Sequence, residues 1–128
     1  KVKGTEKVGT GTTYELNVKF KNITGNVGLK LRVGKESETI LKLDYADKKF
    51  VLDRSKGEQV DKSLRKVALD NVNELELTVF VDNSSIEVFI NGGKEVFSSK
   101  ILPKFSADGI EVFADNETDV EIVKWEWK

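Results

Sequence analysis

The sequence predicts an all-β fold, arranged as an antiparallel β-sandwich of short strands. Apolar and polar residues alternate with a period of two in segment after segment, which is the pattern of a strand with one face on a core. Turn residues such as Gly, Asn and Asp separate these segments at intervals of about ten residues. No segment of the 128-residue chain carries a convincing helical pattern. Regular short strands favour an antiparallel sandwich over a parallel α/β sheet.

The composition is that of a globular protein, with 38% hydrophobic residues, 34% charged residues and a net charge of −1. This balance favours neither nucleic acid nor a membrane as a partner. The chain has no His, Cys or Met, which excludes a Ser-His-Asp triad, a thiolate nucleophile, an imidazole metal site and a disulfide. Residues 1–128 are expected to form a single domain. Because the chain starts at Lys1 without Met, we expect a fragment or a mature product.

The first half of the chain predicts a series of strands joined by turns. Residues 1–12 are rich in Gly and Thr and are expected to form a linker or an irregular edge strand. Strands are expected over residues 13–21, 27–34, 39–45 and 49–55. In the second of these, the side chains expected on one face are Val27, Leu29, Leu31 and Val33, with Arg32 facing the other way. Residues 56–66 are expected to form a polar loop, with one possible helical turn near residues 61–64.

The clearest pattern is a meander over residues 74–101. If Asn83-Ser84 is a two-residue hairpin loop, the register of the flanking strands is fixed. This register pairs Val81 with Ile86, Val79 with Val88, Leu77 with Ile90, Phe80 with Glu87 and Thr78 with Phe89. The first three pairs share one face and the last two share the other. Residues 94–102 then return as a third strand.

The C-terminal segment predicts two more strands, over residues 109–115 and 118–128, with a turn at residues 115–117. Trp125 and Trp127 lie on one face of the last strand. We favour a role for them in the core or in packing between domains, and the alternative is a platform that stacks on sugar rings. The oxygen-bearing side chains of residues 115–119 match no specific calcium loop, so no metal site is predicted.

Two ordered motifs resemble a known family. The first is the run from Val81 to Gly93 followed by Phe97-Ser98-Ser99-Lys100-Ile101-Leu102-Pro103, and the second is Leu52-Asp53-Arg54-Ser55-Lys56 upstream of it. Together they resemble the C-terminal β-sandwich domain of glycoside hydrolase family 32, which contains invertases, levanases and sucrose-6-phosphate hydrolases. One position departs from the family pattern, because Asn83 stands where the family commonly has Arg.

The resemblance implies a two-sheet, jelly-roll-like sandwich of the concanavalin type. It also implies that the chain is non-catalytic, because the family's catalytic motifs lie in a five-bladed propeller that precedes this domain. The expected partner is that propeller in the same polypeptide, with fructan or fructose as a further partner, and no cofactor is expected. The parent enzyme would be cytoplasmic if it is a sucrose-6-phosphate hydrolase and secreted if it is a levanase.

The candidate carbohydrate-binding residues are Asp53, Arg54 and Glu87, with Asp82 and Ser85 beside them. Carboxylates accept hydrogen bonds and a guanidinium donates several, so together they can hold vicinal sugar hydroxyls. The resemblance implies that related sandwiches, the family 66 carbohydrate-binding modules, hold the terminal fructose of levan with such groups. The alternative, which we favour, is a structural network that braces the strand ends. No residue of the chain is expected to be catalytic.

Overall fold

The computed structural model describes residues 2–34, 38–53, 64–69, 73–82, 85–91, 95–100 and 108–126. These residues form strands and turns, and they include no helix able to span a membrane. The strands are β1 (Val2–Thr10), β2 (Tyr14–Lys21), β3 (Val27–Val33), β4 (Thr39–Asp44), β5 (Lys49–Asp53), β6 (Leu64–Ala68), β7 (Leu75–Val81), β8 (Ser85–Ile90), β9 (Glu95–Lys100) and β10 (Gly109–Glu126). The predicted all-β fold is confirmed.

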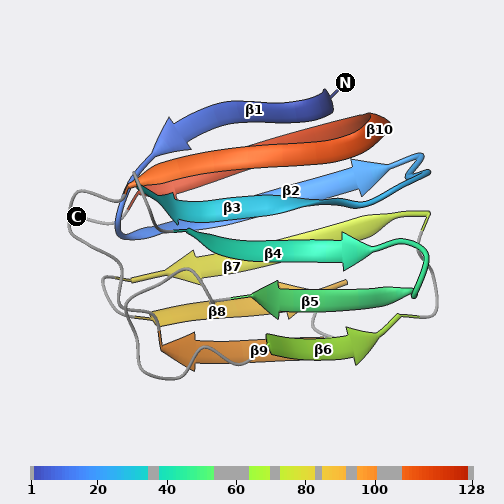
Figure 1. Cartoon of the computed structure of the whole chain (residues 1–128). Helices are drawn as coiled ribbons and strands as arrows, with labels where there is room; N and C mark the ends of the chain where they lie inside the picture. The colour runs from blue at the N-terminus through green and yellow to red at the C-terminus, as the bar shows by residue number, and fades with distance from the viewer. Residues whose placement is uncertain are drawn as a thin grey trace.

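The strands form two antiparallel layers that face each other (Figure 1). The first layer, sheet A, has the order β6-β5-β4-β3-β10-β1, and the second, sheet B, has the order β10-β2-β7-β8-β9. Strand β10 belongs to both sheets and joins them along one side of the sandwich. Strands β6 and β9 are the edges on the opposite side (Figure 1).

Strand β10 joins the sheets because it changes partners along its length. Residues 109–114 pair with β3, and residues 119–126 pair with β2. Since β2 and β3 run in opposite directions (Figure 1), the chain reverses between these two parts. The sequence predicted two strands separated by a turn at residues 115–117, and the reversal lies at that place. The strand assignment nevertheless continues through it, so both parts belong to one element, β10, whose polar middle passes from sheet A to sheet B.

The core lies between the two sheets and contains the residues that the alternation predicted. The inward side chains of β2, β7 and β8 are at most 1% exposed, and they are Tyr14, Leu16, Val18, Phe20, Leu75, Leu77, Val79, Val81, Ile86, Val88 and Ile90. All five predicted β7–β8 pairs are confirmed. The backbone N–H of Asp82 donates to the carbonyl oxygen of Ser85 (2.9 Å), which closes the hairpin. The loop residues Asn83 and Ser84 lie outside the described part of the chain.

Strand β3 departs from the predicted alternation at Arg32. This residue has a φ of 50° and lies at a bulge, where Gly109 pairs with Val33 and Ile110 with Leu31. The extra residue rotates the strand, so the Arg32 side chain is only 2% exposed although it was expected opposite the core residues. Val33 in turn is only partly buried. The prediction of a regular alternation was therefore wrong at the end of β3.

Two segments that the sequence left uncertain are strands. β1 is an edge strand that pairs with β10 from Val2 to Thr10. β6 pairs with β5 over residues 64–68, part of which was expected to be a polar loop. Its five residues gave no period-two signal, because the polar pair Arg65-Lys66 is followed by the apolar pair Val67-Ala68. Residues 61–63 of the expected helical turn lie outside the described residues, and Leu64 begins β6.

Candidate functional site: the outer face of sheet B

Strand β10 places two large apolar side chains on the outer face of sheet B. Trp125 and Val123 are each 50% exposed. They pair directly with Glu15 and Asn17 of β2, which alternate with core residues of that strand. Directly paired residues share a face of a sheet, so Trp125 and Val123 point away from the core. Of the two roles expected for Trp125, the one in the core is therefore wrong, and packing between domains stays a prediction, while Trp127 lies outside the described residues.

Strands β7, β8 and β9 add further apolar side chains to the same face. The rings of Phe80 and Phe89 meet edge to face, with their centroids 5.7 Å apart and an interplanar angle of 83°. Val96 pairs with Phe89 and is 47% exposed. Together these side chains make up what we call the apolar patch: Phe80, Phe89, Val96, Val123 and Trp125.

A chain of polar side chains crosses the middle of the apolar patch. The Asn17 Nδ2 donates to Glu15 Oε2 (3.1 Å), and the Thr78 Oγ1 donates to Asn17 Oδ1 (2.8 Å). All three side chains are partly buried. Because they satisfy one another, covering them with a partner would cost less free energy than covering unpaired polar groups.

Three of the predicted sugar-binding residues lie on the β7–β8 hairpin. Glu87 is exposed on the outer face of sheet B, where it pairs directly with Phe80. Asp82 is also exposed, and Ser85 is partly buried, on either side of the hairpin loop. The structure therefore places a carboxylate beside the aromatic rings of the apolar patch, as the predicted register implied.

Asp53 does not share this face. It lies at the end of β5 and alternates with Leu52, which is fully buried in the core, so it faces outward from sheet A. β5 and β7 run toward the same end of the sandwich (Figure 1). Asp53 and Glu87 therefore lie at the same end of the sandwich, but Asp53 is on the outer face of sheet A and Glu87 is on the outer face of sheet B. Because facing sheets are about 10 Å apart, the two carboxylates point in opposite directions with the core between them. Arg54 lies outside the described residues.

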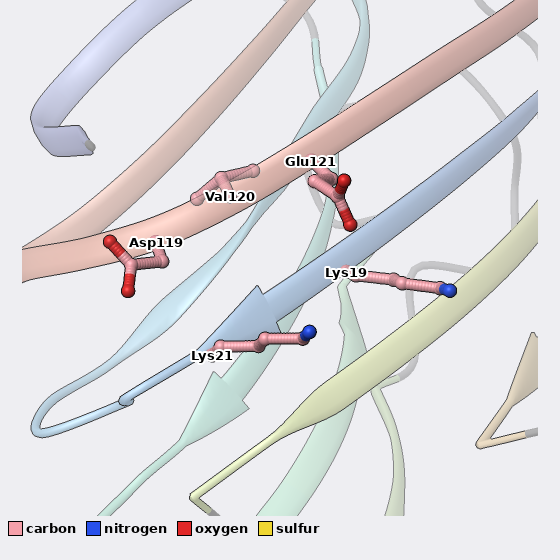
Figure 2. Close-up of a pocket in the computed structure, with 5 residues that line it drawn as sticks. All are labelled: Lys19, Lys21, Asp119, Val120 and Glu121. Atoms are coloured by element: carbon pink, nitrogen blue, oxygen red, sulfur yellow. The ribbon is translucent and has the colours of Figure 1, made fainter.

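Two hollows lie on the outer face of sheet B, at the end of β2 away from Tyr14. One has a volume of about 220 Å³ and is lined by Lys19, Lys21, Asp119, Val120 and Glu121 (Figure 2). The other, of about 280 Å³, is lined by Lys19, Phe20, Lys21, Glu74, Leu75, Glu76 and Asn91. The sequence did not predict a site at these residues, although the alternation in β2 does place Lys19 and Lys21 opposite the core side chains.

The opposite end of the core contains a buried tyrosine beside a buried arginine. Tyr14 is 0% exposed, and its Oη has no hydrogen-bond partner within the described part of the chain. Burial raises the pKa of Tyr14 well above its ordinary value, and the nearby Arg32 guanidinium opposes this shift. Burial lowers the pKa of Arg32, against the opposing effects of Tyr14 and Asp108. Lys124 partly covers this end, with its Nζ 5.7 Å from the centroid of the Tyr14 ring.

The polar segment at residues 115–119 forms hydrogen bonds with the loop between β2 and β3, at the corner where β10 passes between the sheets. The Asn116 Nδ2 donates to the carbonyl oxygen of Thr24 (3.0 Å), and the Thr118 Oγ1 donates to the carbonyl oxygen of Asn116 (2.8 Å). The Asn22 Nδ2 donates to Asp119 Oδ2 (2.6 Å). Within the described residues, no group of three or more His, Cys, Asp or Glu side chains is placed to hold a metal ion.

Comparison with known proteins identifies the family of the chain. The family model described as glycosyl hydrolases family 32 C terminal matches residues 1–126. The chain belongs to this family. Its motifs on β5 and on the β7–β8 hairpin had indicated the same assignment.

The relatives of this family 32 C-terminal domain are much longer proteins. The chain is 35% identical over 117 residues to a levanase of Bacillus subtilis, which covers 84% of the chain but only 17% of the levanase. It is 35% identical over 99 residues to a sucrose-6-phosphate hydrolase of Zymomonas mobilis, covering 67% of the chain and 19% of that protein. The matched region therefore corresponds to less than a fifth of either relative.

Solved structures show the same fold. The exo-inulinase of Aspergillus awamori superposes with a TM-score of 0.84 at 24% identity, covering 97% of this chain and 27% of that one. The fructan 1-exohydrolase IIa of Cichorium intybus gives a TM-score of 0.72 at 16% identity, covering 99% of this chain and 34% of that one. The expected jelly-roll-like sandwich is confirmed.

Proposed function

We propose that this chain is a non-catalytic domain of an enzyme that hydrolyses fructans or sucrose, and that it stabilises the enzyme by packing against its catalytic part. The relatives carry names of enzymes that act on levan or on sucrose 6-phosphate. Most of each relative's length lies outside the region that matches this chain, which leaves room there for the catalytic residues. The domain's mechanism is the burial of apolar surface, and it breaks no bond.

The observation that carries this proposal is the apolar patch. Three of its side chains are about half exposed, and they are Val96, Val123 and Trp125. Covering large apolar side chains stabilises an association by about 25 cal/mol for each Å² removed from water. A catalytic part of the same polypeptide is held near the patch at a high effective concentration, so a modest contact area is sufficient to keep the two together.

The polar chain through the patch also supports packing. Glu15, Asn17 and Thr78 already bond to one another. A partner that covers the apolar patch would therefore meet polar side chains that already bond to one another. A sugar-binding surface would be expected to present unpaired donors and acceptors at its centre instead.

The test compares Trp125→Ser in two contexts, the isolated domain and the longer polypeptide that includes the catalytic part. We expect little change in the melting temperature of the isolated domain, because Trp125 is half exposed there. In the longer polypeptide we expect the melting temperature to fall by several degrees, since the substitution removes an interface contact. Lys66→Ala, on an exposed position of β6, is the control. Equal shifts in the two contexts would reject packing through this face.

The second candidate function is binding of terminal fructose by Glu87, Asp82, Ser85, Asp53 and Arg54. It is supported by the exposed Glu87 carboxylate beside the rings of Phe80 and Phe89, since sugar rings stack on aromatic faces while carboxylates accept from hydroxyls. Because Asp53 faces outward from the other sheet, we expect Glu87 to contribute more than Asp53.

This second function is tested by titrating the isolated domain with fructose and with a levan oligosaccharide, followed by calorimetry. Saturable binding that is lost in Glu87→Ala, with an unchanged melting temperature, would make the domain a carbohydrate-binding module. Asp53→Ala tests whether the other sheet takes part. No binding at millimolar sugar would leave packing as the function of the domain.

A further inference from the structure

The two hollows at the end of β2 lie side by side, because Lys19 and Lys21 line both of them. Lys19 and Lys21 extend from β2, and Asp119 and Glu121 extend from β10 (Figure 2). The second hollow continues across β2 to Glu74 and Glu76. A ligand with several linked units could therefore occupy both hollows and cross β2 between them.

Two charged groups in the first hollow have no partner in the described part of the chain. Asp119 pairs directly with Lys21 in the β10–β2 register, but its carboxylate accepts from the Asn22 amide instead. The side chains of Lys21 and Glu121 make no hydrogen bond or ion pair with any described residue. They offer a ligand an ammonium donor and a carboxylate acceptor on opposite sides of one hollow.

Lys19 connects this hollow to the second one. Its Nζ lies 3.7 Å from Glu76 Oε2, and both side chains are about half exposed, at 52% and 45%. Such an exposed pair contributes little to stability, so its two groups can turn toward a ligand at low cost. The Asn91 side chain already has a partner in the protein, because its Oδ1 accepts from the backbone N–H of Glu76 (3.0 Å).

The charges of the lining restrict the ligand. Two lysines and four acidic residues line the hollows, so the net charge is negative and disfavours a phosphate or another anion. A bound metal is disfavoured as well, because the described residues contain no suitable group of ligands. Alternating donors and acceptors instead suit a neutral ligand with many hydroxyl groups, each of which both donates and accepts.

We infer that these hollows hold a short stretch of a neutral fructan chain, as a site separate from the apolar patch and from Glu87. The choice of fructan as the ligand rests on the proposed function. It is supported by the names of relatives and structural neighbours, which include a levanase, an exo-inulinase and a fructan exohydrolase. The site lies on the same face as the apolar patch but at the other end of β2. A partner confined to the patch would leave the hollows open, and a bound chain would then be held beside the catalytic part.

The test is an NMR titration of the domain with levan-type and inulin-type fructotriose, with inorganic phosphate as a second probe. We expect saturable shifts of the backbone amides of Lys19, Lys21, Val120 and Glu121 with at least one trisaccharide, and none with phosphate. Lys21→Ala and Glu121→Gln should each weaken binding about tenfold, since each removes a charged hydrogen bond. The matched controls Lys66→Ala and Glu6→Gln lie on exposed positions of sheet A and should leave the affinity unchanged.

Three results would overturn the inference. The first is an absence of saturable shifts at millimolar trisaccharide. The second is a set of shifts confined to the β7–β8 hairpin, which would place the sugar at Glu87 and leave the hollows empty. The third is saturation by phosphate, which would make the hollows an anion site. None of these results bears on packing through the apolar patch, which the melting temperatures of Trp125→Ser test independently.

Discussion

The outer faces of the two sheets differ in how far their large apolar side chains are covered by neighbouring residues. On sheet A, Phe113 is partly buried over Gly28, and Val51 is only 6% exposed. The Lys30 ammonium lies 5.8 Å from the centroid of the Phe113 ring and covers it further. On sheet B, Trp125 and Val123 remain half exposed, with nothing comparable above them among the described residues.

This difference separates apolar side chains that stabilise the domain from those that are available to a partner. Sheet A lacks a side chain at Gly28 and thereby creates a slot that accepts the ring of Phe113. Sheet B has Glu15 and Asn17 beside its exposed residues, and these are satisfied by their neighbours and provide no slot. Substitutions on sheet A should therefore change the stability of the domain itself, and substitutions in the apolar patch should change its association.

The largest effect is expected from Gly28→Ala. A Cβ at this position would overlap the carbonyl oxygen of Leu41 and lie 2.7 Å from the Cζ of Phe113. Since the backbone must shift to accept it, we expect a loss of about 3 kcal/mol in the free energy of unfolding. Gly9→Ala is the matched control, because a Cβ there has no atom within 4 Å. Chemical denaturation measures both, and equal effects would contradict the proposed slot.

A smaller loss is expected from Phe113→Ala. Removing a partly buried ring from the surface of sheet A should lower the free energy of unfolding by about 2 kcal/mol, which is less than for a fully buried ring. The loss should be the same in the isolated domain and in the longer polypeptide, because this ring is covered by its own domain. A loss that grows when the catalytic part is present would place the interface on sheet A.

Tyr14→Phe should have the smallest effect at neutral pH. The buried Oη lacks a described partner, so removing it should leave the stability unchanged or raise it by about 1 kcal/mol. This substitution acts at the core between the two faces, and it should change neither the slot nor the patch.

The effect of Tyr14→Phe should depend on pH. Because burial raises the pKa of Tyr14, the unfolded chain loses this proton first as the pH increases. Above about pH 10, the ordinary pKa of tyrosine, ionisation of Tyr14 stabilises the unfolded chain but not the folded one, so the free energy of unfolding falls as the pH increases, whereas below that pH it is unaffected. Denaturation from pH 8 to about pH 11 should therefore show a steeper loss for the natural protein than for Tyr14→Phe. Parallel profiles would contradict this assignment.

The sequence was most informative where short turns fix the register. The β7–β8 hairpin is confirmed pair by pair, because a two-residue loop leaves one antiparallel register that unites the aliphatic residues. The polar residues 115–117 also lie where the chain reverses, as predicted. The sequence could not show that the two parts on either side pair with strands of different sheets, because that depends on contacts with β2 and β3, which are distant in the sequence.

The candidate sites were harder to predict because alternation does not reveal what covers an outer face. The size of Trp125 fitted either the core or an interface between domains, and its exposure depends on its pairing with the outward-facing Glu15. The bulge at Arg32 depends on the register between β3 and β10, which no local pattern reveals. Asp53 and Glu87 could not be assigned to opposite faces until the two sheets were known.

The central claim is that the apolar patch packs against the catalytic part of the same polypeptide. Hydroxyl-radical footprinting tests it most directly, by comparing side-chain oxidation in the isolated domain and in the longer polypeptide. We expect the oxidation of Trp125 and Phe89 to fall severalfold when the catalytic part is present, and that of Phe113 to stay the same. Unchanged oxidation of Trp125 and Phe89, or protection of Phe113 instead, would contradict the account.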